Sequence, residues 1–570
     1  MAIKRSGKKK KKKLGSLRSS SSGSSTVQSD RRPKWVAKTP PCQLNCPQGT
    51  DIRGILRTIA DGEKHEKPRD ETFLTAFTML TKNNPFPSVC GRVCPHPCET
   101  GCNRNELDEA ASINAMERFI GDWGLEKELA LPAGEMEHAD KPIAVIGAGP
   151  AGLSAAFHLR KHGYPVTVFE AFPKAGGMLR YGIPAYRLPR DVLDAEIQRI
   201  VDMGVTLKCD VSIGRDIPLE EIRQQYAAVF VGIGAHQGRL LRCPGEDAEN
   251  VWTGTSFLNE ANQGKTIDVG KNVVVIGGGD TAIDAARMAR RMGSDAMILY
   301  RRTREEMPAI QEEIDGAEKE GVDIRLLAAP LEINVENGRA VSMRCQVMEL
   351  GEPDDSGRRR PVPIEGEEFT IPVDTIVAAI SQEPDFTGLE DLRETPKDWI
   401  KADEYGATQV DGVYSGGDNL NLALVTTAIF QGRVAAETID YGIRGIERPA
   451  EETKPEIKAD KMVLTFYEKK LREHGEEMAA EAALADPDAE IQSGLTEEQA
   501  VEEAARCLSC GECFDCGTCW SFCQDNAIVK PLIVGDPYKF KLEFCKGCDK
   551  CAEQCPCGYI EMYDPMTSSA

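Results

Sequence analysis

Two runs of cysteines near the C-terminus have a spacing suited to iron–sulfur chemistry. Each run follows the pattern C-x2-C-x2-C-x3-C, and Pro556 follows the second run. In domains that hold two [4Fe–4S] clusters, this doubled spacing lets the fourth cysteine of each run bind the cluster of the other run. The runs therefore predict two ligand sets, which are Cys513, Cys516, Cys519 and Cys555, and Cys523, Cys545, Cys548 and Cys551.

A second group of six cysteines lies between residues 42 and 102. Four of them are separated by three residues each, and prolines follow Cys46 and Cys94. Thiolates at such spacing can wrap an iron–sulfur cluster, and proline after cysteine recurs in cluster-binding loops. Zinc is the alternative, but structural zinc sites favour C-x2-C pairs, which this stretch lacks. The group consists of Cys42, Cys46, Cys90, Cys94, Cys98 and Cys102.

A glycine-rich turn at residues 147–152 follows the apolar run Ile143–Ile146 and precedes helical sequence at 153–159. Its pattern is G-x-G-x-x-G. The first glycine permits a tight turn, the second lets a pyrophosphate approach the backbone, and the third lets helix and strand pack closely. A second strand at 166–169 ends at Glu170, where a carboxylate that binds a ribose hydroxyl belongs. The segment predicts a dinucleotide site.

The same pattern recurs at residues 277–282 as G-x-G-x-x-A, after an apolar strand at 272–276. Its paired strand, 296–300, does not end in an acid and is followed by Arg301 and Arg302. An acid would bind a ribose 2′-hydroxyl, whereas two cations suit a 2′-phosphate. The second site is therefore predicted to prefer NADPH. The alternative is that both arginines only solvate the end of a strand.

These motifs must be positioned by several domains. Strand-like sequence at 373–380 and 413–415 and helical sequence at 424–441 predict that the first nucleotide domain is split around the second. The predicted fold is multidomain, with an α-helical iron–sulfur domain, two Rossmann-like α/β domains and a ferredoxin-like α+β domain. The expected bounds are 1–34 for a disordered basic tail, 35–140 for the helical iron–sulfur domain, 141–250 and 372–447 for the first nucleotide domain, 251–371 for the NADPH domain, 448–503 for a helical linker, and 504–570 for the ferredoxin domain.

The composition narrows the class of protein. The net charge is −22, and residues 1–34 contribute +11, so the remainder carries −33. Such an acidic body argues against nucleic acid as the main partner.

No apolar run approaches the roughly 20 residues of a membrane span, and no secretory signal follows the basic start. A cytoplasmic protein is predicted, with its twenty cysteines used as metal ligands rather than in disulfides. The lysine run at 8–13 is a solvated tail, a docking arm or a contact for an anionic surface.

Together these motifs resemble the small subunit of NADPH-dependent glutamate synthase and its relatives over roughly residues 40–445. Those relatives include the large subunit of the electron-bifurcating ferredoxin:NADP oxidoreductase and the iron–sulfur domains of dihydropyrimidine dehydrogenase. With its C-terminal ferredoxin, the chain looks most like the iron–sulfur flavoprotein encoded with dissimilatory sulfite reductases. The resemblance rests on Cys90–Cys102, Gly147–Gly152, Gly176–Pro189, Gly277–Arg287, Tyr300–Pro308 and Gly416–Asp418.

The resemblance implies that the first nucleotide site holds FAD and the second holds NADPH. Glu170 would bind the FAD ribose and Asp418 its ribityl chain. The implied FAD residues are Gly147, Gly149, Pro150, Ala151, Gly152, Glu170, Gly177, Met178, Leu179, Arg187, Gly234, Gly417, Asp418 and Thr427. The implied NADPH residues are Gly277, Gly278, Gly279, Asp280, Thr281, Arg301 and Arg302.

About four [4Fe–4S] clusters are expected. Carried over by motif, Cys46, Cys94, Cys98 and Glu117 would hold one cluster, which leaves only Cys42 and Cys102 for another. The chain departs from the family here. The family has an R-C-x2-C-G segment before its first C-x3-C-P, where this chain has Trp35–Pro41, and the same segment occurs instead at Arg506–Gly511. Cys507 and Cys510 would complete the second cluster by folding back. In the alternatives, Cys90 serves instead, or the pair forms free thiols or a zinc site.

The implied activity is NAD(P)H:acceptor oxidoreduction, from NADPH through FAD and the clusters to, or from, an iron–sulfur partner. That partner is expected to be a sulfite reductase, a glutamate synthase-type subunit or a ferredoxin, in an oligomer or larger complex. The alternative is an electron-wiring subunit with vestigial nucleotide sites, in a larger complex of the bifurcating or non-bifurcating kind. The intact glycines of both motifs favour the enzyme.

Overall fold

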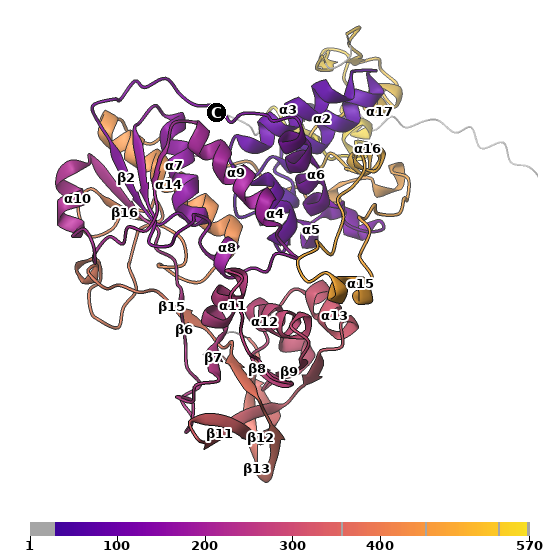
Figure 1. Ribbon diagram of the computed structural model, residues 1–570. Coiled ribbons are helices and arrows are strands. Elements are labelled where there is room, and N and C mark those ends of the chain that lie inside the picture. The colour runs from indigo at the N-terminus through magenta and orange to yellow at the C-terminus, as the bar shows by residue number, and fades with distance from the viewer. Residues whose placement is uncertain (1–28, 355–356, 451–452, 534–535, 567–570) are drawn as a thin grey trace, which may run out of the picture.

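The computed structural model describes residues 29–354, 357–450, 453–533 and 536–566. Most of the predicted basic tail lies outside these residues. Figure 1 shows a helical domain and two sheet-containing domains, with the C-terminal segment on the helical domain, far from the long strands β11–β13. No helix among the described residues is long and apolar enough to cross a membrane.

The helical domain is built around an aromatic core. The ring of Phe73 packs edge-on against those of Phe119 and Trp123, at centroid distances of 5.1 and 5.7 Å. Helix α2 begins where the side chain of Asp51 accepts a hydrogen bond from the Gly54 amide, which caps its first turn. The helices are α1 (Pro41–Asn45), α2 (Ile52–Lys64), α3 (Arg69–Thr81), α4 (Pro87–Val93), α5 (Pro97–Thr100) and α6 (Ile113–Glu126).

The first sheet is parallel, in the order β16-β5-β2-β3-β4. Its strands are β2 (Ile143–Ile146), β3 (Val166–Phe169), β4 (Thr206–Lys208), β5 (Ala228–Val231) and β16 (Val413–Ser415). Helices α7 (Pro150–Lys161) and α14 (Val425–Arg444) pack closely, because Gly432 of α14 leaves room for the Ala151 carbonyl. β16 comes from beyond the second sheet, so this domain consists of two separate chain segments.

The second sheet is also parallel, in the order β10-β9-β8-β14-β7. Its strands are β7 (Val251–Thr253), β8 (Asn272–Ile276), β9 (Asp295–Leu299), β10 (Asp323–Arg325) and β14 (Thr375–Ala378). The predicted boundary at residue 371 is wrong, because β14 hydrogen-bonds to β8 and β7 rather than to the first sheet. Helices α11 (Gly254–Asn262), α12 (Asp280–Arg291) and α13 (Gln311–Lys319) and an antiparallel sheet of β11 (Ala328–Glu336), β12 (Arg339–Pro353) and β13 (Arg359–Pro372) complete this domain.

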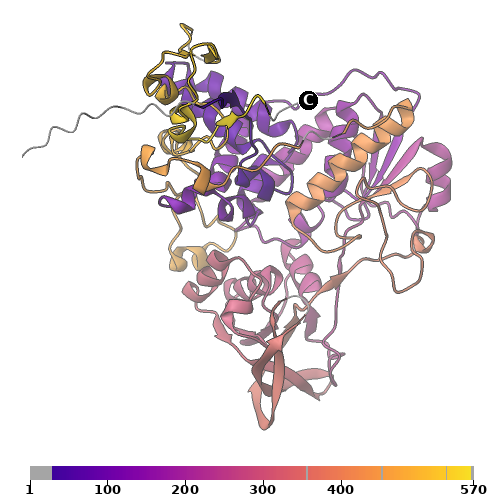
Figure 2. The same cartoon turned by 180° about the vertical axis from the view of Figure 1, so that it is seen from behind.

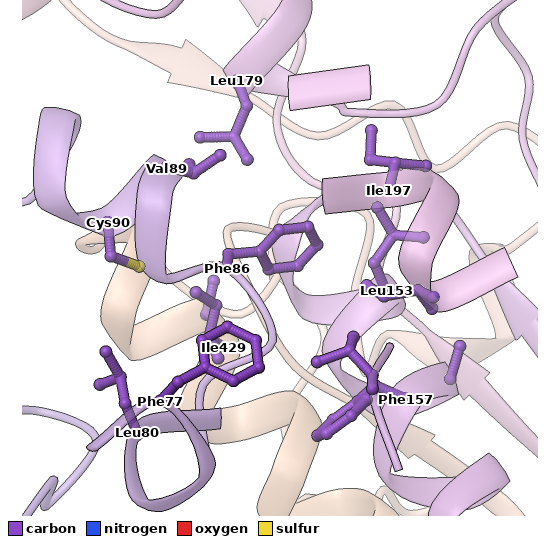
Figure 3. Packing of buried hydrophobic residues seen from close by; sticks show 14 of the residues in the cluster. Phe77, Leu80, Phe86, Val89, Cys90, Leu153, Phe157, Leu179, Ile197 and Ile429 are labelled. Atoms are coloured by element: carbon purple, nitrogen blue, oxygen red, sulfur yellow. The ribbon is translucent and has the colours of Figure 1, made fainter. Parts of the chain in front are cut away.

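The helical domain and the first sheet domain share one hydrophobic core (Figure 3). Phe86 lies just before α4, and Val89 lies within it. Both belong to the same cluster of buried side chains as Leu153 of α7 and Ile197 of α9 (Arg190–Asp202). Burial of such side chains contributes about 1.5–3 kcal/mol each. The cysteine-rich helices are therefore fixed against the first nucleotide domain.

The linker was predicted to be helical, but most of it is not. Between residues 448 and 503, the described residues form only two α-helices, α15 (Ala480–Ala485) and α16 (Glu497–Ala505). The rest is irregular because its backbone bonds to distant segments: Thr39 donates to the Pro455 carbonyl at 2.9 Å and Ile491 to the Tyr186 carbonyl at 3.1 Å. Such bonds replace the local ladder of a helix.

The two ends of the described chain are paired. β1 (Arg32–Trp35) runs antiparallel to β19 (Ile560–Tyr563), so the tail predicted to be disordered through residue 34 is ordered at its end. The Trp35 ring stacks on Phe540 and Tyr559, with centroids 4.3 and 5.3 Å apart. The C-terminal domain also has α17 (Thr518–Ser521), α18 (Lys550–Glu553) and a hairpin of β17 (Ile528–Val529) and β18 (Lys539–Phe540). It lies against the helical domain in both views (Figure 2).

Candidate functional site: two nucleotide cavities and four cysteine groups

The first cavity lies at the carboxyl edge of the first sheet and has a volume of about 490 Å³. Gly147 leaves β2 with φ of +97°, and a side chain there would approach the Gly232 carbonyl to 2.3 Å. The N-terminus of α7 therefore faces open space, which suits a phosphate group. The predicted FAD residues that line the cavity are Gly147, Gly149, Pro150, Ala151, Glu170, Gly177, Met178, Leu179, Gly234, Gly417 and Asp418.

Two of the predicted FAD residues that line this cavity are acids, and they follow different strands. Glu170 follows β3 and accepts hydrogen bonds from the amides of Ala148, at 2.7 Å, and Phe172, at 2.9 Å. Asp418 follows β16 and accepts one from the Ala423 amide at 3.2 Å. Burial raises the pKa of Asp418 to about 6, and it also raises the pKa of Glu170. Both are suited to accept hydrogen bonds from sugar hydroxyls.

Three predicted FAD residues do not line the cavity, so their predicted contacts are corrected. The Arg187 guanidinium donates to both carboxylate oxygens of Asp284, at 3.0 and 2.8 Å, and therefore points to the second domain. Thr427 lies beside lining residues of α14 without being one of them. Gly152 lies behind the wall and lets α7 approach β2.

The second cavity lies at the carboxyl edge of the second sheet and has a volume of about 660 Å³. Arg301 is exposed in its wall, whereas Arg302 is buried and pairs with Asp354 at 2.7 Å. Arg302 also donates to the Arg359 carbonyl at 2.7 Å, so its guanidinium holds the neighbouring hairpin in place. The predicted NADPH residues that line this cavity are Gly277, Gly278, Gly279, Thr281, Arg301 and Arg302.

Sequence reasoning placed one residue in the wrong cavity and missed others. Asp280 lines the first cavity and accepts a hydrogen bond from the Ile310 amide at 3.0 Å. The second cavity also contains Arg239, Arg242 and Arg358. No motif marks these three arginines, because they reach the cavity from segments outside the G-x-G-x-x-A unit. The cavity wall is rich in cations that suit a phosphorylated ligand.

Cys46, Cys94, Cys98 and Glu117 line one cavity of the helical domain. Glu117 is on α6, and its Oε1 accepts a hydrogen bond from the Asn84 side chain at 2.8 Å. Burial raises the pKa of Glu117 to about 7 and, with the Glu117 charge, that of Cys94 to about 12. A bound metal would favour the deprotonated forms, since thiolates and carboxylates are the ligating species. The donor set suits an iron–sulfur cluster.

This cysteine cavity and the first nucleotide cavity share a wall. Val93 and Pro95 line the nucleotide cavity, while Cys94 between them lines the cysteine cavity. In α14, Val425 faces the nucleotide cavity and Thr426 the cysteine cavity. The Cys94 sulfur lies 3.9 Å from the Thr426 hydroxyl, which closes the wall. Only a thin layer of protein therefore separates the two spaces.

The C-terminal cysteines also assemble in two groups. Cys513, Cys516, Cys519 and Cys555 line a small cavity that Trp35 helps to enclose. In the other group, burial and the nearby Cys545, Cys548 and Cys523 raise the pKa of Cys551 to about 12. The structure brings together the cysteines that the doubled spacing groups, and Cys557, which lies outside both runs, also lines the small cavity, with its sulfur 3.8 Å from that of Cys555. The two ligand sets stay a prediction.

The segments of Cys42 and Cys102 lie against that of Cys507 and Cys510, because the Lys38 amide donates to the Gly511 carbonyl at 3.1 Å and the Arg104 guanidinium donates to the Arg506 carbonyl. Among the described residues, no three His, Cys, Asp or Glu side chains meet at a point where a single metal ion would be held. The Cys46 group and the Cys513 group instead each line a cavity. A [4Fe–4S] cluster is larger than one ion and is held by ligands around it.

Comparison with known proteins places these features in a family. Residues 141–432 match the family described as pyridine nucleotide-disulphide oxidoreductase, and residues 15–129 match dihydropyrimidine dehydrogenase domain II with its 4Fe-4S cluster. The chain is 36% identical to NADPH-Fe(3+) oxidoreductase subunit beta of Geobacter sulfurreducens, covering 83% of this chain and 75% of that protein.

Two further relatives have similar identities. Identity is 37% to NADP(+)-dependent formate dehydrogenase subunit beta of Moorella thermoacetica, over 83% of this chain and 70% of that protein. It is 34% to the glutamate synthase [NADPH] small chain of Azospirillum brasilense, over 70% of this chain and 86% of that protein. The chain therefore belongs to the pyridine nucleotide-disulphide oxidoreductase family, as an NADPH-dependent iron–sulfur flavoprotein oxidoreductase of the glutamate synthase small-subunit type.

Proposed function

We propose that the chain passes electrons from NADPH, through FAD and about four [4Fe–4S] clusters, to an iron–sulfur partner protein. The wall between the first nucleotide cavity and the Cys46, Cys94, Cys98 and Glu117 group carries this proposal. When bound, the cofactors supply hydride and single-electron transfer, and the protein supplies orientation and electrostatics. Cys94 and Thr426 would hold the flavin and the first cluster as neighbours.

The residues of the first cavity would bind FAD in an extended form. The start of α7 would face the pyrophosphate, Glu170 the adenosine ribose and Asp418 the ribityl chain. Each assignment follows from the position of the residue at the carboxyl end of a strand, where ligands of open α/β sheets bind. The Gly177–Leu179 segment would lie along the isoalloxazine side.

Of the two arginines predicted for the second cavity, Arg301 is the one that is exposed and open to a 2′-phosphate. Arg301→Ala is expected to weaken NADPH binding by about one to two decades, because a charge-assisted contact typically contributes about 1.5–3 kcal/mol. NADH binding should change little, so the preference for NADPH should fall by the same factor. The measurement is the Kd of each coenzyme by titration of flavin fluorescence. Equal losses for both coenzymes would contradict the assignment.

Arg302→Ala provides a second variant with a different expected pattern. Arg302 holds Asp354 and the Arg359 carbonyl, so its loss should disturb the hairpin and weaken both coenzymes. A pattern identical to that of Arg301→Ala would show that Arg302 also contacts the phosphate.

Purified without oxygen, the protein is expected to contain one FAD and about sixteen iron atoms, as four [4Fe–4S] clusters would require. Adding NADPH should bleach the flavin and then the cluster absorbance. Iron near half that content would remove the N-terminal clusters from the proposal, and zinc in place of iron would remove their redox role. If the protein holds its FAD and clusters but NADPH does not reduce them, the alternative of an electron-wiring subunit is favoured.

The partner is proposed from the relatives' names, since several are subunits of larger redox enzymes. We infer that this chain also works in a complex and exchanges electrons with a sulfite reductase, a glutamate synthase-type subunit or a ferredoxin. The C-terminal ferredoxin-like domain, as in the iron–sulfur flavoprotein of dissimilatory sulfite reductase gene clusters, would be the contact. Mass spectrometry of the natively purified complex identifies the partner.

A further inference from the structure

We propose that Cys42, Cys102, Cys507 and Cys510 form a single [4Fe–4S] site whose ligands come from both ends of the chain. Cys42 and Cys102 belong to the helical domain, and the other two cysteines follow α16, beyond both nucleotide domains. The inference deepens the proposed electron path, on which it rests, by naming the cluster between the helical domain and the ferredoxin-like domain.

Hydrogen bonds bring together the segments that carry the four cysteines. The Lys38 amide, four residues before Cys42, donates to the carbonyl of Gly511, which follows Cys510, at 3.1 Å. The Arg104 guanidinium, two residues after Cys102, donates to the carbonyl of Arg506, which precedes Cys507. Buried thiols gathered in this way can lose their protons when a metal binds, since the thiolate is the ligating species.

Cys90, which is the competing ligand, lies beside a different group. Its neighbours are Glu117 and Cys94, and its sulfur accepts a contact from the Gln48 amide at 3.9 Å. Asn84 lies 3.8 Å from the same sulfur. Gln48, Cys94 and Glu117 line the cavity of the Cys46 group, and Asn84 donates to Glu117, so Cys90 is placed to support that group and not to complete the one at Cys42.

Buried ion pairs hold the Cys507 segment in place. Arg506 is 2% exposed and donates to the Ala110 carbonyl at 3.1 Å and to Glu503 at 2.6 Å. Glu503, which is fully buried, accepts a hydrogen bond from the Ser112 amide at 2.8 Å. The arginine of the R-C-x2-C-G segment therefore fixes the end of α16 to the loop that follows Cys102.

Two further arginines bind the same segment from the helical domain. Arg53 of α2 donates to the Cys510 carbonyl at 2.6 Å and to the Lys38 carbonyl at 2.9 Å. Arg104 donates to the Arg506 carbonyl. Carbonyl bonds of this kind fix the backbone on both sides of the two cysteines. The guanidinium of Arg53 also brings positive charge to a site whose thiolates are negative.

The site leads directly into the ferredoxin-like domain. Cys507, Cys510, Cys513, Cys516 and Cys519 follow one another at C-x2-C spacing, so a single run serves two groups. The division falls at Gly511, which has φ of +72° and donates to the Cys557 carbonyl at 2.7 Å. This left-handed turn, which favours glycine, sends Cys510 toward the helical domain and Cys513 toward the ferredoxin-like group.

The test is Cys507→Ser with Cys510→Ser in the full chain, purified anaerobically with its cofactors. Iron is expected to fall by about a quarter, since one of about four clusters is lost. One EPR signal of the reduced protein should disappear, while both ferredoxin signals and the FAD content remain. Cys209→Ser with Cys243→Ser is the matched control, because both lie outside the four groups; its iron content and spectrum should not change.

Cys42→Ser tests the same site from the other end of the chain and should remove the same EPR signal, so the inference remains testable if the double variant fails to fold. It is overturned by unchanged iron in the double variant, by loss of a different signal in Cys42→Ser, or by loss of this signal in Cys90→Ser. The proposed function fails separately, if the wild-type protein holds no redox-active clusters or NADPH does not reduce its flavin.

Discussion

Arg187→Met is expected to lower the free energy of unfolding by about 3–5 kcal/mol, the typical cost of removing one partner from a buried ion pair. The Arg187 side chain is 5% exposed and lies 2.8 Å from Asp284 and 3.2 Å from Glu313. Both carboxylates belong to the second nucleotide domain, whereas Arg187 belongs to the first. Methionine would leave these two acids without that cation.

The measurement is the denaturant midpoint of the holoprotein, followed by flavin release. Arg344→Met is a matched control, because Arg344 also pairs with two acids, Glu332 and Glu368, but is 40% exposed. Exposed pairs typically contribute less than about 1 kcal/mol each. A further variant, Arg187→Met with Asp284→Leu, should recover part of the loss, since it also removes one stranded charge. An Arg187→Met midpoint as high as that of the control would contradict the role of the pair.

Gly152→Ala is expected to weaken FAD binding by about one to two decades, in line with the 1–3 kcal/mol cost of overpacking. A methyl group at this position would lie 1.9 Å from the Gly147 carbonyl oxygen and 3.1 Å from the Val145 side chain. Because the added methyl group would clash with both the turn and the strand, α7 would have to shift away from β2. That shift would displace the helix N-terminus from the pyrophosphate position.

FAD content per chain and the Kd of FAD after apoprotein reconstitution measure this effect. Gly442→Ala serves as the control, because the added methyl group would come no closer than 3.5 Å to its surroundings, the nearest atom being the Tyr414 hydroxyl oxygen. That variant lies inside α14, where alanine is the better helix former by about 1 kcal/mol. Full retention of FAD by Gly152→Ala would show that α7 does not bind the pyrophosphate as proposed.

Features encoded within a few residues could be predicted from the sequence. The G-x-G-x-x-G turn at 147–152 lies between strand and helix, because glycine spacing and apolar runs determine that geometry locally. The two C-terminal cysteine groups likewise follow from spacing alone. The capping box of Thr496 and Gln499 at the start of α16 is also local, since its two residues are three positions apart in the sequence.

Features that depend on distant partners could not be predicted. The apolar sequence of β14 predicts a buried strand that would suit either sheet, so the sequence alone does not assign it to the second sheet. Arg187 lies in a segment that resembles a flavin-binding loop, but its partners are about a hundred residues away, as the separation of 97 residues from Asp284 shows. The irregular linker had helix-forming composition, but its backbone bonds to distant residues, among them Thr39, Tyr186 and Pro556, take the place of helical bonds.

The pairing of β1 with β19 has a consequence for the order in which the protein is made. Trp35 donates a hydrogen bond to the Tyr538 carbonyl across 503 residues of chain. At the usual translation rates of 5–20 residues per second, β1 leaves the ribosome roughly 25–100 s before its partner exists. During that interval it presents an unpaired strand edge, of the kind that promotes aggregation. Synthesis of β19 is thus the step that removes this hazard, and a nascent chain stalled before β19 would retain it.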